Sequence, residues 1–341
     1  MKVVVLHTEL AGYTIACLRA LGRAGHAVVV VHWPVAGEAP FNFDDQRPFS
    51  LVQRANFSAS WLADQQADLV LMSGWVDRGY VQAVRAMRRT GRSRCVICLD
   101  NHWTGSTRQR LGALWFKLSL RQHLDGAWVP GAPQQRFAKR LGFDKSAVKE
   151  GYYSADVAKF LGAARTGDGA QKRLIYIGRY VPSKGLDSLW DAFEVFSQKH
   201  PSWTLHCFGT GSSWAERRQH PQIVHHGFVQ PEKFREHLAG ATGFVMPSLN
   251  EPWGVALHEM AAAGLPLIAS DAVGAAEKFI AQGENGWVFP AGDPDEIQSC
   301  LERLSEVAGN PAHWQSMAAT SIELASKLTP EKWAETAVSF V

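Results

Sequence analysis

Short apolar runs alternate with amphipathic stretches along this 341-residue chain, and the alternation constrains its fold more than any other feature. In the first 150 residues, strands are predicted over Lys2–Leu6, Ala27–His32, Ala67–Met72, Arg94–Leu99 and Gly126–Val129. Helical periodicity between them predicts helices over Thr14–Gly25, Gly79–Arg89 and Thr107–His123. The strict alternation of strands and helices indicates a parallel sheet covered by helices on both faces.

The same alternation starts again at residue 173. Strands are predicted over Arg173–Gly178, Thr204–Gly209, Ile223–His225, Gly243–Pro247 and Leu267–Ser270. Helices are predicted over Leu186–Lys199, Pro231–Ala239, Gly254–Ala263, Asp293–Ala308 and Pro311–Ser326. Each half is long enough to bury its own core. We therefore predict an α/β protein built from two successive doubly wound units.

The composition is that of an ordinary globular protein, with 46% hydrophobic and 20% charged residues. No apolar run reaches the roughly 20 residues of a membrane-spanning helix, and the run after Met1 is too short for a secretory signal. The five scattered cysteines fit a reducing compartment, so we expect a cytoplasmic protein. Cys95 and Cys98 lie in a predicted buried strand and are expected to be buried thiols rather than zinc ligands.

The net charge of +3 hides an asymmetry between the two halves. Residues 1–150 contain 20 Lys and Arg against 11 Asp and Glu, whereas the remainder contains 15 against 21. A basic N-terminal half suggests an anionic partner there, such as a phospholipid surface or a charged acceptor. No nucleic-acid motif accompanies this charge, so binding of DNA or RNA is not predicted.

Two cations follow the first predicted strand of the second unit. Gly178 permits a sharp turn, and Arg179 and Lys184 lie five residues apart on the same loop. Doubly wound domains bind ligands outside the carboxyl ends of their strands. An arginine and a lysine at that place can compensate the charge of a diphosphate leaving group without a metal ion. The alternative interpretation is a pair of solvated surface charges.

A glycine pair, Gly209 and Gly211, follows the next predicted strand. Trp214 occupies the third glycine position of the dinucleotide-binding fingerprint, so that fingerprint is absent. Gly209 therefore marks either a tight turn or a close approach of the backbone to a ligand.

The most informative segment runs from Pro247 to Pro266. A loop that carries Glu251 leads into a helix whose free N–H groups, around Gly254–Ala256, form an anion site. Glu251 can accept hydrogen bonds from sugar hydroxyls, and Glu259 on the new helix is suited to a vicinal diol such as a ribose. Two carboxylates beside a diphosphate would repel it unless they faced hydroxyl groups, and this assigns their roles.

Two patterns nearby resemble metal sites and are rejected. His258 and Glu259 begin an H-E-x-x-H, but Ala262 occupies the closing position. Asp293 and Asp295 form a D-x-D that opens a predicted helix, where aspartate is a favoured cap.

The order and spacing of these motifs resemble the retaining GT-B glycosyltransferases of the E-x7-E group, which are family 4-like. The resemblance covers residues 173–297 and rests on Gly178-Arg179, Lys184-Gly185, Gly209-x-Gly211, Glu251-x7-Glu259, Gly264-x-Pro266, Ala269-Ser270-Asp271, Gly283-Glu-Asn-Gly286 and Pro290-Ala-Gly292-Asp293. It implies two facing Rossmann-like domains with the active site between them. Residues 1–152 would form the acceptor-side domain, and residues 153–326 the donor domain. Residues 327–341 would form a C-terminal helix that crosses back to the acceptor-side domain.

The resemblance also implies roles for single residues. Arg179 and Lys184 would hold the diphosphate, Glu251 the transferred sugar and Glu259 the ribose. The donor-binding residues predicted in this way are Gly12, Gly178, Gly209, Trp253, Gly254, Val255, Ala256 and Glu259. No cofactor is expected, because metal is usually dispensable in the family. Retention is explained by front-face attack, in which the donor's own phosphate oxygen receives the acceptor proton.

The N-terminal half departs from the family pattern. Leu10–Tyr13, which contains Gly12, stands where many relatives have a glycine pair. Many relatives also have a histidine that ends the fourth strand and faces the donor sugar. Here Asp100, Asn101 or His102 takes that place, depending on register. We choose His102 as a catalytic residue because a neutral imidazole can hydrogen-bond a sugar hydroxyl, and a helix-capping loop is the alternative.

Basic residues gather around the predicted helix Thr107–His123. Arg85, Arg88, Arg89, Arg92 and Arg94 precede it, and the helix sets Arg108, Arg110, Lys117 and Arg121 beside Leu111, Leu114, Trp115, Phe116 and Leu118. A basic amphipathic helix can lie in a bilayer interface. The alternative is a helix that packs its apolar stripe on the sheet and leaves its arginines solvated. An anionic membrane surface is thus a candidate partner, and attachment to the inner face of the plasma membrane is a hypothesis.

The resulting functional hypothesis is a retaining hexosyltransferase. It would move a sugar from a UDP- or GDP-sugar to a polysaccharide, glycolipid or other glycan acceptor, as in polysaccharide or lipopolysaccharide synthesis. Two alternatives remain: a GT-B-fold nucleotide-sugar epimerase, and a non-catalytic sugar-nucleotide-binding subunit. The intact set of Arg179, Lys184, Glu251 and Glu259 argues against the second alternative.

Overall fold

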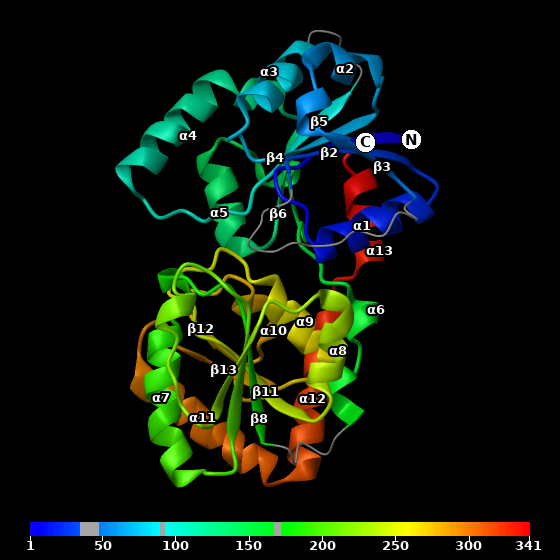
Figure 1. Ribbon diagram of the computed structural model, residues 1–341. Helices are drawn as coiled ribbons and strands as arrows, with labels where there is room; N and C mark the ends of the chain where they lie inside the picture. The colour runs from blue at the N-terminus through cyan, green and yellow to red at the C-terminus, as the bar shows by residue number, and fades with distance from the viewer. Residues whose placement is uncertain (35–47, 89–92, 167–171) are drawn as a thin grey trace. The chain divides into compact units, whose positions relative to one another are not determined.

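The computed structural model describes residues 1–34, 48–88, 93–166 and 172–341. The chain forms two compact units, Met1–Ser154 with Thr329–Val341, and Ala155–Leu328. Each unit is built around one parallel sheet with helices on both faces (Figure 1). Two arginines of the basic cluster, Arg89 and Arg92, lie outside the described residues.

In the described part of the N-terminal unit, seven parallel strands form a sheet in the order β3-β2-β1-β4-β5-β6-β7. Their bounds are β1 Lys2–Leu6, β2 Ala27–His32, β3 Ser50–Gln53, β4 Leu69–Ser73, β5 Arg94–Cys98, β6 Gly126–Val129 and β7 Val148–Glu150. The five predicted strands are present, each displaced by two residues at most. The sequence pattern does not predict β3, which has no fully buried residue, or β7, which is three residues long.

Alternate residues of the central strands face opposite layers of helices. The helices are α1 Gly12–Arg23, α2 Ala59–Asp64, α3 Arg78–Met87, α4 Thr107–Ser119, α5 Ala132–Arg140 and α13 Pro330–Val338. Val4 and Leu6 pack with residues of α2, α3, α4 and α5, whereas Val3 and Val5 pack with α1 and α13. Both faces of the sheet are therefore buried, as the near-continuous apolar strands require.

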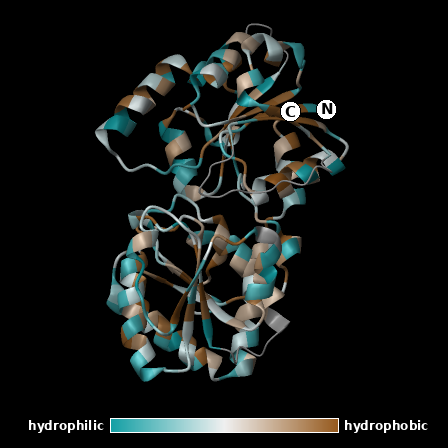
Figure 2. Cartoon of the chain, in the orientation of Figure 1, coloured by the Kyte–Doolittle hydropathy of each residue, from teal (hydrophilic) through white to brown (hydrophobic). Residues whose placement is uncertain are grey.

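In the described part of the C-terminal unit, six parallel strands form a sheet in the order β10-β9-β8-β11-β12-β13. Their bounds are β8 Arg173–Ile177, β9 Thr204–Phe208, β10 Ile223–Gly227, β11 Ala241–Met246, β12 Leu267–Ser270 and β13 Gly286–Phe289. The helices are α6 Val157–Phe160, α7 Leu186–Lys199, α8 Pro231–Leu238, α9 Val255–Ala263, α10 Ala276–Phe279, α11 Pro294–Ala308 and α12 Pro311–Ser326. Figure 2 shows that the strands at the centre of each unit are apolar, whereas the surrounding helices mix apolar and polar residues.

The predicted fold class, α/β with two Rossmann-like parallel sheets, is confirmed. All five cysteines are free and buried, as expected of small apolar side chains. Asp293 caps α11 by accepting hydrogen bonds from the N–H groups of Asp295 and Glu296, which confirms the capping interpretation of that D-x-D. Within the described residues, no helix is long and apolar enough to cross a membrane.

The last helix, α13, completes one face of the N-terminal sheet. Trp333 is buried against Trp128 of β6, with ring centroids 4.6 Å apart, and its indole N–H donates to the carbonyl oxygen of Tyr152 at 2.6 Å. Ala337 packs into the same cluster. The predicted return of the C-terminal helix to the N-terminal unit is thus observed, and its helix face is a part of the core.

Replacement of Trp333 by alanine is expected to destabilise the N-terminal unit. A buried tryptophan truncated to alanine typically costs about 3–5 kcal/mol of unfolding free energy, because apolar burial is lost and a cavity remains. Chemical denaturation followed by tryptophan fluorescence would measure the loss. The control is Glu335→Ala, an exposed position on the same helix. Equal denaturation midpoints for Trp333→Ala and Glu335→Ala would show that α13 is not part of the core.

Candidate functional site

The strand order of the C-terminal sheet reverses between β8 and β11, which are neighbours. The helices that follow them pack in different layers, α7 with α11 and α9 with α12 (Figure 1). A reversal of this kind opens a crevice outside the carboxyl ends of the strands, where doubly wound domains bind ligands. Two loops, residues 178–185 after β8 and 247–254 after β11, leave the sheet here and carry Gly178, Arg179, Lys184, Glu251, Trp253 and Gly254 of the predicted site residues.

Gly185 brings these two loops into backbone contact. Its φ angle is +64°, and a β-carbon there would lie 2.1 Å from the carbonyl oxygen of Pro247. The N–H groups of Leu249 and Asn250 both donate to the carbonyl oxygen of Ser183, at 2.9 and 3.2 Å. Backbone contacts thus fix the two loops to each other.

Gly209 makes a similar contact with the loop after β8. Its φ angle is +129°, and a β-carbon would lie 2.0 Å from the carbonyl oxygen of Gly178. At Gly211 a β-carbon would lie 2.4 Å from the carbonyl oxygen of Tyr180. Gly209 therefore makes a close approach to the protein's own backbone, and the interpretation as a close approach to a ligand stays a prediction. Contact of Gly178 or Gly209 with a donor stays a prediction.

Lys184 and Glu251, one from each loop, form an ion pair through Nζ and Oε2. Their side chains are only 14% and 16% exposed, so the attraction is screened less than between surface charges. The Glu251 backbone is also fixed, because its N–H donates to Ala272 at 3.2 Å and its carbonyl accepts from Gly274 at 3.0 Å. The sequence places both side chains at one site, and the structure adds that they neutralise each other.

Arg179 lies on the same loop as Lys184 but is exposed. The Tyr176 hydroxyl donates to the Arg179 carbonyl oxygen at 3.1 Å. Burial raises the pKa of Tyr176, Cys207 and Glu251 nearby raise it further, and Arg179 lowers it. Arg179 and Glu251 are therefore both close to this tyrosine. Among the described residues no acidic side chain pairs with Arg179, so its guanidinium is available to an anion.

The N-terminus of α9 meets the same crevice. Gly254 precedes the helix with a φ angle of +98°, and a β-carbon there would lie 2.9 Å from Met246 Sδ and 3.1 Å from Glu251 Cγ. No side chain caps this described helix, and its first turn contains no acidic residue. The first N–H groups of a helix lack intrahelical partners, so those of Val255 and Ala256 are suited to an anion.

Trp253 and His258 support α9 instead of lining its N-terminal end. Trp253 is 2% exposed and packs edge-on against Phe279, so its predicted donor contact cannot come from the indole ring as it lies here. His258 stacks on Phe279, accepts a hydrogen bond from the N–H of Ala155 and donates one to the Ala325 carbonyl. Burial lowers its pKa to about 4. Its two ring nitrogens are occupied, in agreement with the rejected zinc motif.

Glu259 lies one residue further along α9, beside α6. Burial raises the pKa of its carboxyl group to about 7, with Lys159 lowering it and Asp156 raising it. A carboxyl group with this pKa is a hydrogen-bond donor below neutral pH and an acceptor above it. The predicted ribose contact would therefore be sensitive to pH.

The remaining predicted residues belong to the N-terminal unit. Gly12 is the first residue of α1, a helix that also has no capping side chain. The Asp100 carboxylate accepts hydrogen bonds from the hydroxyl of Tyr153 at 3.1 Å and from Asn101 Nδ2 at 3.3 Å. His102 is partly buried in the irregular segment before α4. Which of Asp100, Asn101 and His102 faces a donor sugar stays open.

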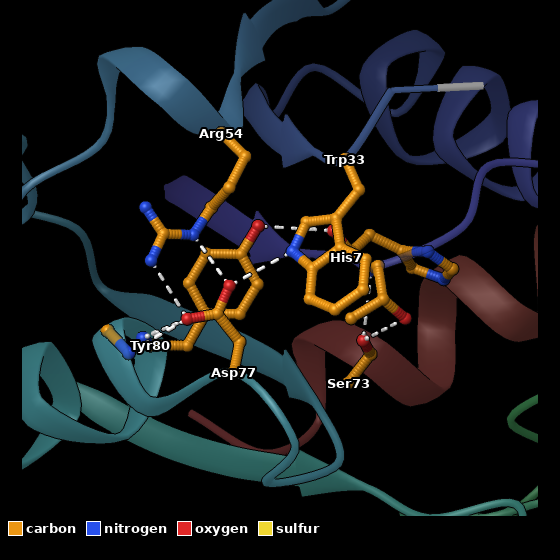
Figure 3. A network of polar contacts seen from close by, with 8 residues as sticks. His7, Trp33, Arg54, Ser73, Asp77 and Tyr80 are labelled. Carbon is orange, nitrogen blue, oxygen red and sulfur yellow. Dashed lines mark hydrogen bonds and ion pairs between the residues drawn. The ribbon is translucent and has the colours of Figure 1, made fainter. Parts of the chain in front are cut away.

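Figure 3 shows a polar network in this unit that the sequence analysis does not predict. Asp77 accepts from Arg54 Nε at 2.6 Å and Nη2 at 2.9 Å, and from Trp33 Nε1 at 2.9 Å. It also caps α3 through the N–H groups of Gly79 and Tyr80. Burial opposes ionisation of Asp77, yet these hydrogen bonds hold its pKa at about 2. The network joins the segments after β2, β3 and β4, and its charges compensate each other, so we assign it a structural role.

Known proteins with similar sequences and folds indicate a family for part of this chain. Residues 171–306 match the family model described as "Glycosyl transferases group 1". The chain is 29% identical over 181 residues to exopolysaccharide phosphotransferase SCO2592 of Streptomyces coelicolor, covering 51% of this chain and 18% of that protein. It is 31% identical over 170 residues to glycogen synthase of Mycobacterium tuberculosis, covering 48% and 40%. The chain thus spans less than half the length of these curated relatives.

The fold comparison extends over the whole chain. Anabaena HepE, solved in complex with UDP, superposes with a TM-score of 0.74 at 14% identity and covers 99% of both chains. At this identity the likeness shows the fold alone. The predicted GT-B fold is confirmed, and residues 171–306 are similar to the glycosyl transferases of group 1.

Glu259 is expected to destabilise the protein at alkaline pH. Folding raises the pKa of its carboxyl group from 4.5 to about 7, so stability is lost as the pH rises through this range. Glu259→Gln should therefore melt at a higher temperature than the parent protein at pH 8, and the difference should vanish below pH 5. Differential scanning fluorimetry checks this, with the exposed Glu284→Gln as control. A lower or unchanged melting temperature of Glu259→Gln at pH 8 would contradict the shifted pKa.

Proposed function

We propose that this chain is a retaining glycosyltransferase of the E-x7-E group. It transfers a hexose-type sugar from a UDP- or GDP-sugar to a glycan or lipid-linked acceptor, in polysaccharide, glycolipid or lipopolysaccharide synthesis, without a metal ion. The observation that carries the proposal is the Lys184–Glu251 ion pair beside the uncapped N-terminus of α9. A cation, N–H donors and a carboxylate at one crevice match a ligand that joins an anionic diphosphate to a hydroxyl-rich sugar. The UDP bound by HepE supports this choice of donor.

The residues of the crevice have distinct tasks in this mechanism. Negative charge develops on the diphosphate as the bond between the anomeric carbon and the phosphate oxygen breaks. Lys184, Arg179 and the N–H groups at the start of α9 stabilise that charge. When Lys184 turns to the phosphate, Glu251 loses its partner and accepts hydrogen bonds from the sugar hydroxyls instead.

Retention of configuration follows from attack on the face that the leaving group occupies. The donor's phosphate oxygen takes the acceptor proton, so no protein base is required. Glu259 binds the ribose of the nucleotide. The N-terminal unit supplies the acceptor side, with His102 as the favoured contact to the sugar.

Single substitutions of Lys184 and Glu251 should affect nucleotide binding and sugar transfer differently. Lys184→Ala removes a charged hydrogen bond to phosphate and leaves the Glu251 carboxylate unpaired, so affinity for UDP or GDP should fall about 10- to 100-fold. Glu251→Gln removes no phosphate contact, so it should keep the nucleotide affinity within about threefold while nucleotide release from the sugar donor falls by about 100-fold. Calorimetry with UDP and GDP measures the first effect, and nucleotide release from a panel of nucleotide sugars the second.

Lys199→Ala, an exposed lysine at the end of α7, is the matched control. Unchanged UDP and GDP affinity in Lys184→Ala would refute the assigned site. An isomerised nucleotide sugar, formed from the donor alone, would favour the epimerase alternative. Loss of transfer after treatment with EDTA would contradict metal independence.

A further inference from the structure

Helix α4 carries two apolar stripes, and only one of them is buried. Ala113 and Phe116, with Leu120 just beyond the helix, pack into the core of the N-terminal unit. Phe116, which the sequence pattern alone does not separate from the stripe of leucines, therefore belongs to the inner face. The interpretation that the helix packs on the sheet is correct for these residues and leaves the leucines unexplained.

The second stripe faces solvent. Leu111, Leu114, Trp115 and Leu118 follow the i, i+3, i+4, i+7 spacing of one helix face. Their exposed fractions are 64%, 55%, 44% and 73%. Large exposed apolar side chains that adjoin one another mark a surface that another molecule covers.

Cations border this exposed stripe on both sides. Arg110 and Lys117 are seven residues apart and share one flank, whereas Arg108, three residues before Leu111, lies on the other. Arg121 lies beyond the end of α4 and donates to the carbonyl oxygens of Gly142 and Leu124, both at 2.9 Å. Residues 101–124 contain no Asp or Glu. Within the described part of the chain, no acidic side chain pairs with Arg108, Arg110 or Lys117.

The preceding arginines differ from those of α4, because they are engaged within the protein. Arg88 and Arg94 both pair with Asp125, at 2.9 and 3.3 Å. Arg85 donates to the carbonyl oxygen of Ser119, and its guanidinium lies 5.6 Å from the Trp115 ring. The uncompensated positive charge of this region is thus concentrated on α4, beside its exposed leucines.

We propose that α4 docks on an anionic lipid surface. Its exposed leucines enter the boundary of the acyl chains, and the flanking cations bind the phosphate headgroups. Charge complementarity favours a lipid surface as the partner, because a helix whose charged side chains are all positive is attracted to a negative surface. A second copy of the chain is disfavoured, because a symmetric contact would bring the same cations against each other. The inference concerns the N-terminal unit and does not depend on the proposed donor chemistry.

Flotation of the full chain with lipid vesicles tests the proposal. Binding is expected to vesicles that contain phosphatidylglycerol, with much weaker binding to pure phosphatidylcholine, and it should weaken as salt is added. Leu118→Gln should reduce the partition coefficient roughly tenfold, because a largely exposed leucine no longer enters the bilayer. Lys117→Gln should reduce it about fivefold on anionic vesicles and leave binding to neutral vesicles unchanged.

Val195→Gln, an exposed apolar position on α7, is the matched control for Leu118→Gln, and Arg303→Gln on α11 is the control for Lys117→Gln. A thermal shift with UDP verifies that each variant is folded and keeps the donor site, so failure of the two proposals is distinguishable. Equal absence of binding to both vesicle types would overturn the inference. So would a concentration-dependent dimer that Leu118→Gln disperses, because a second copy would then cover the stripe.

Discussion

Backbone contacts that leave no room for a β-carbon determine the carboxyl edge of the C-terminal sheet. Gly185 touches Pro247, Gly209 touches Gly178, and at Gly274 a β-carbon would lie 2.1 Å from the Pro252 carbonyl oxygen. Each contact joins two loops that leave different strands. Any side chain at these positions would move the loops apart, and side chains borne by separate loops would lose their alignment. The relative positions of the charged side chains therefore depend on these close backbone contacts.

Lys184 and Glu251 compensate each other's charge, which leaves the guanidinium of Arg179 as the uncompensated charge of the two loops, and this affects what they can bind. An incoming phosphate that takes Lys184 leaves the Glu251 carboxylate unpaired in a shielded place, which costs free energy. A ligand that also offers hydroxyl groups to the carboxylate avoids that cost. In the proposed function, this cost favours a molecule that carries both groups in one framework over an inorganic anion, and the selectivity arises from the exchange of partners.

Local pattern predicted much of this structure, and long-range contacts account for what it missed. α7 and α12 have the predicted bounds, because their apolar periodicity is strong and proline or glycine marks their ends. β3 and β13 lack such a signal and exist through pairing with a neighbour. The Lys184–Glu251 contact spans 67 residues and follows only from the strand order. Periodicity also does not show which apolar stripe of α4 is buried, or that the Trp253 side chain is buried. Both depend on contacts with other elements of the fold.

The position of α13 also bears on how the chain folds during its synthesis. The ribosome makes residues 155–328 before Trp333 emerges, so the C-terminal unit can complete its sheet while one face of the N-terminal sheet is covered by α1 but still lacks α13. In this sense the second unit is an insertion within the first. The N-terminal unit is therefore completed after the C-terminal unit, and the apolar surface around Trp128 that α13 covers is exposed to aggregation in the interval.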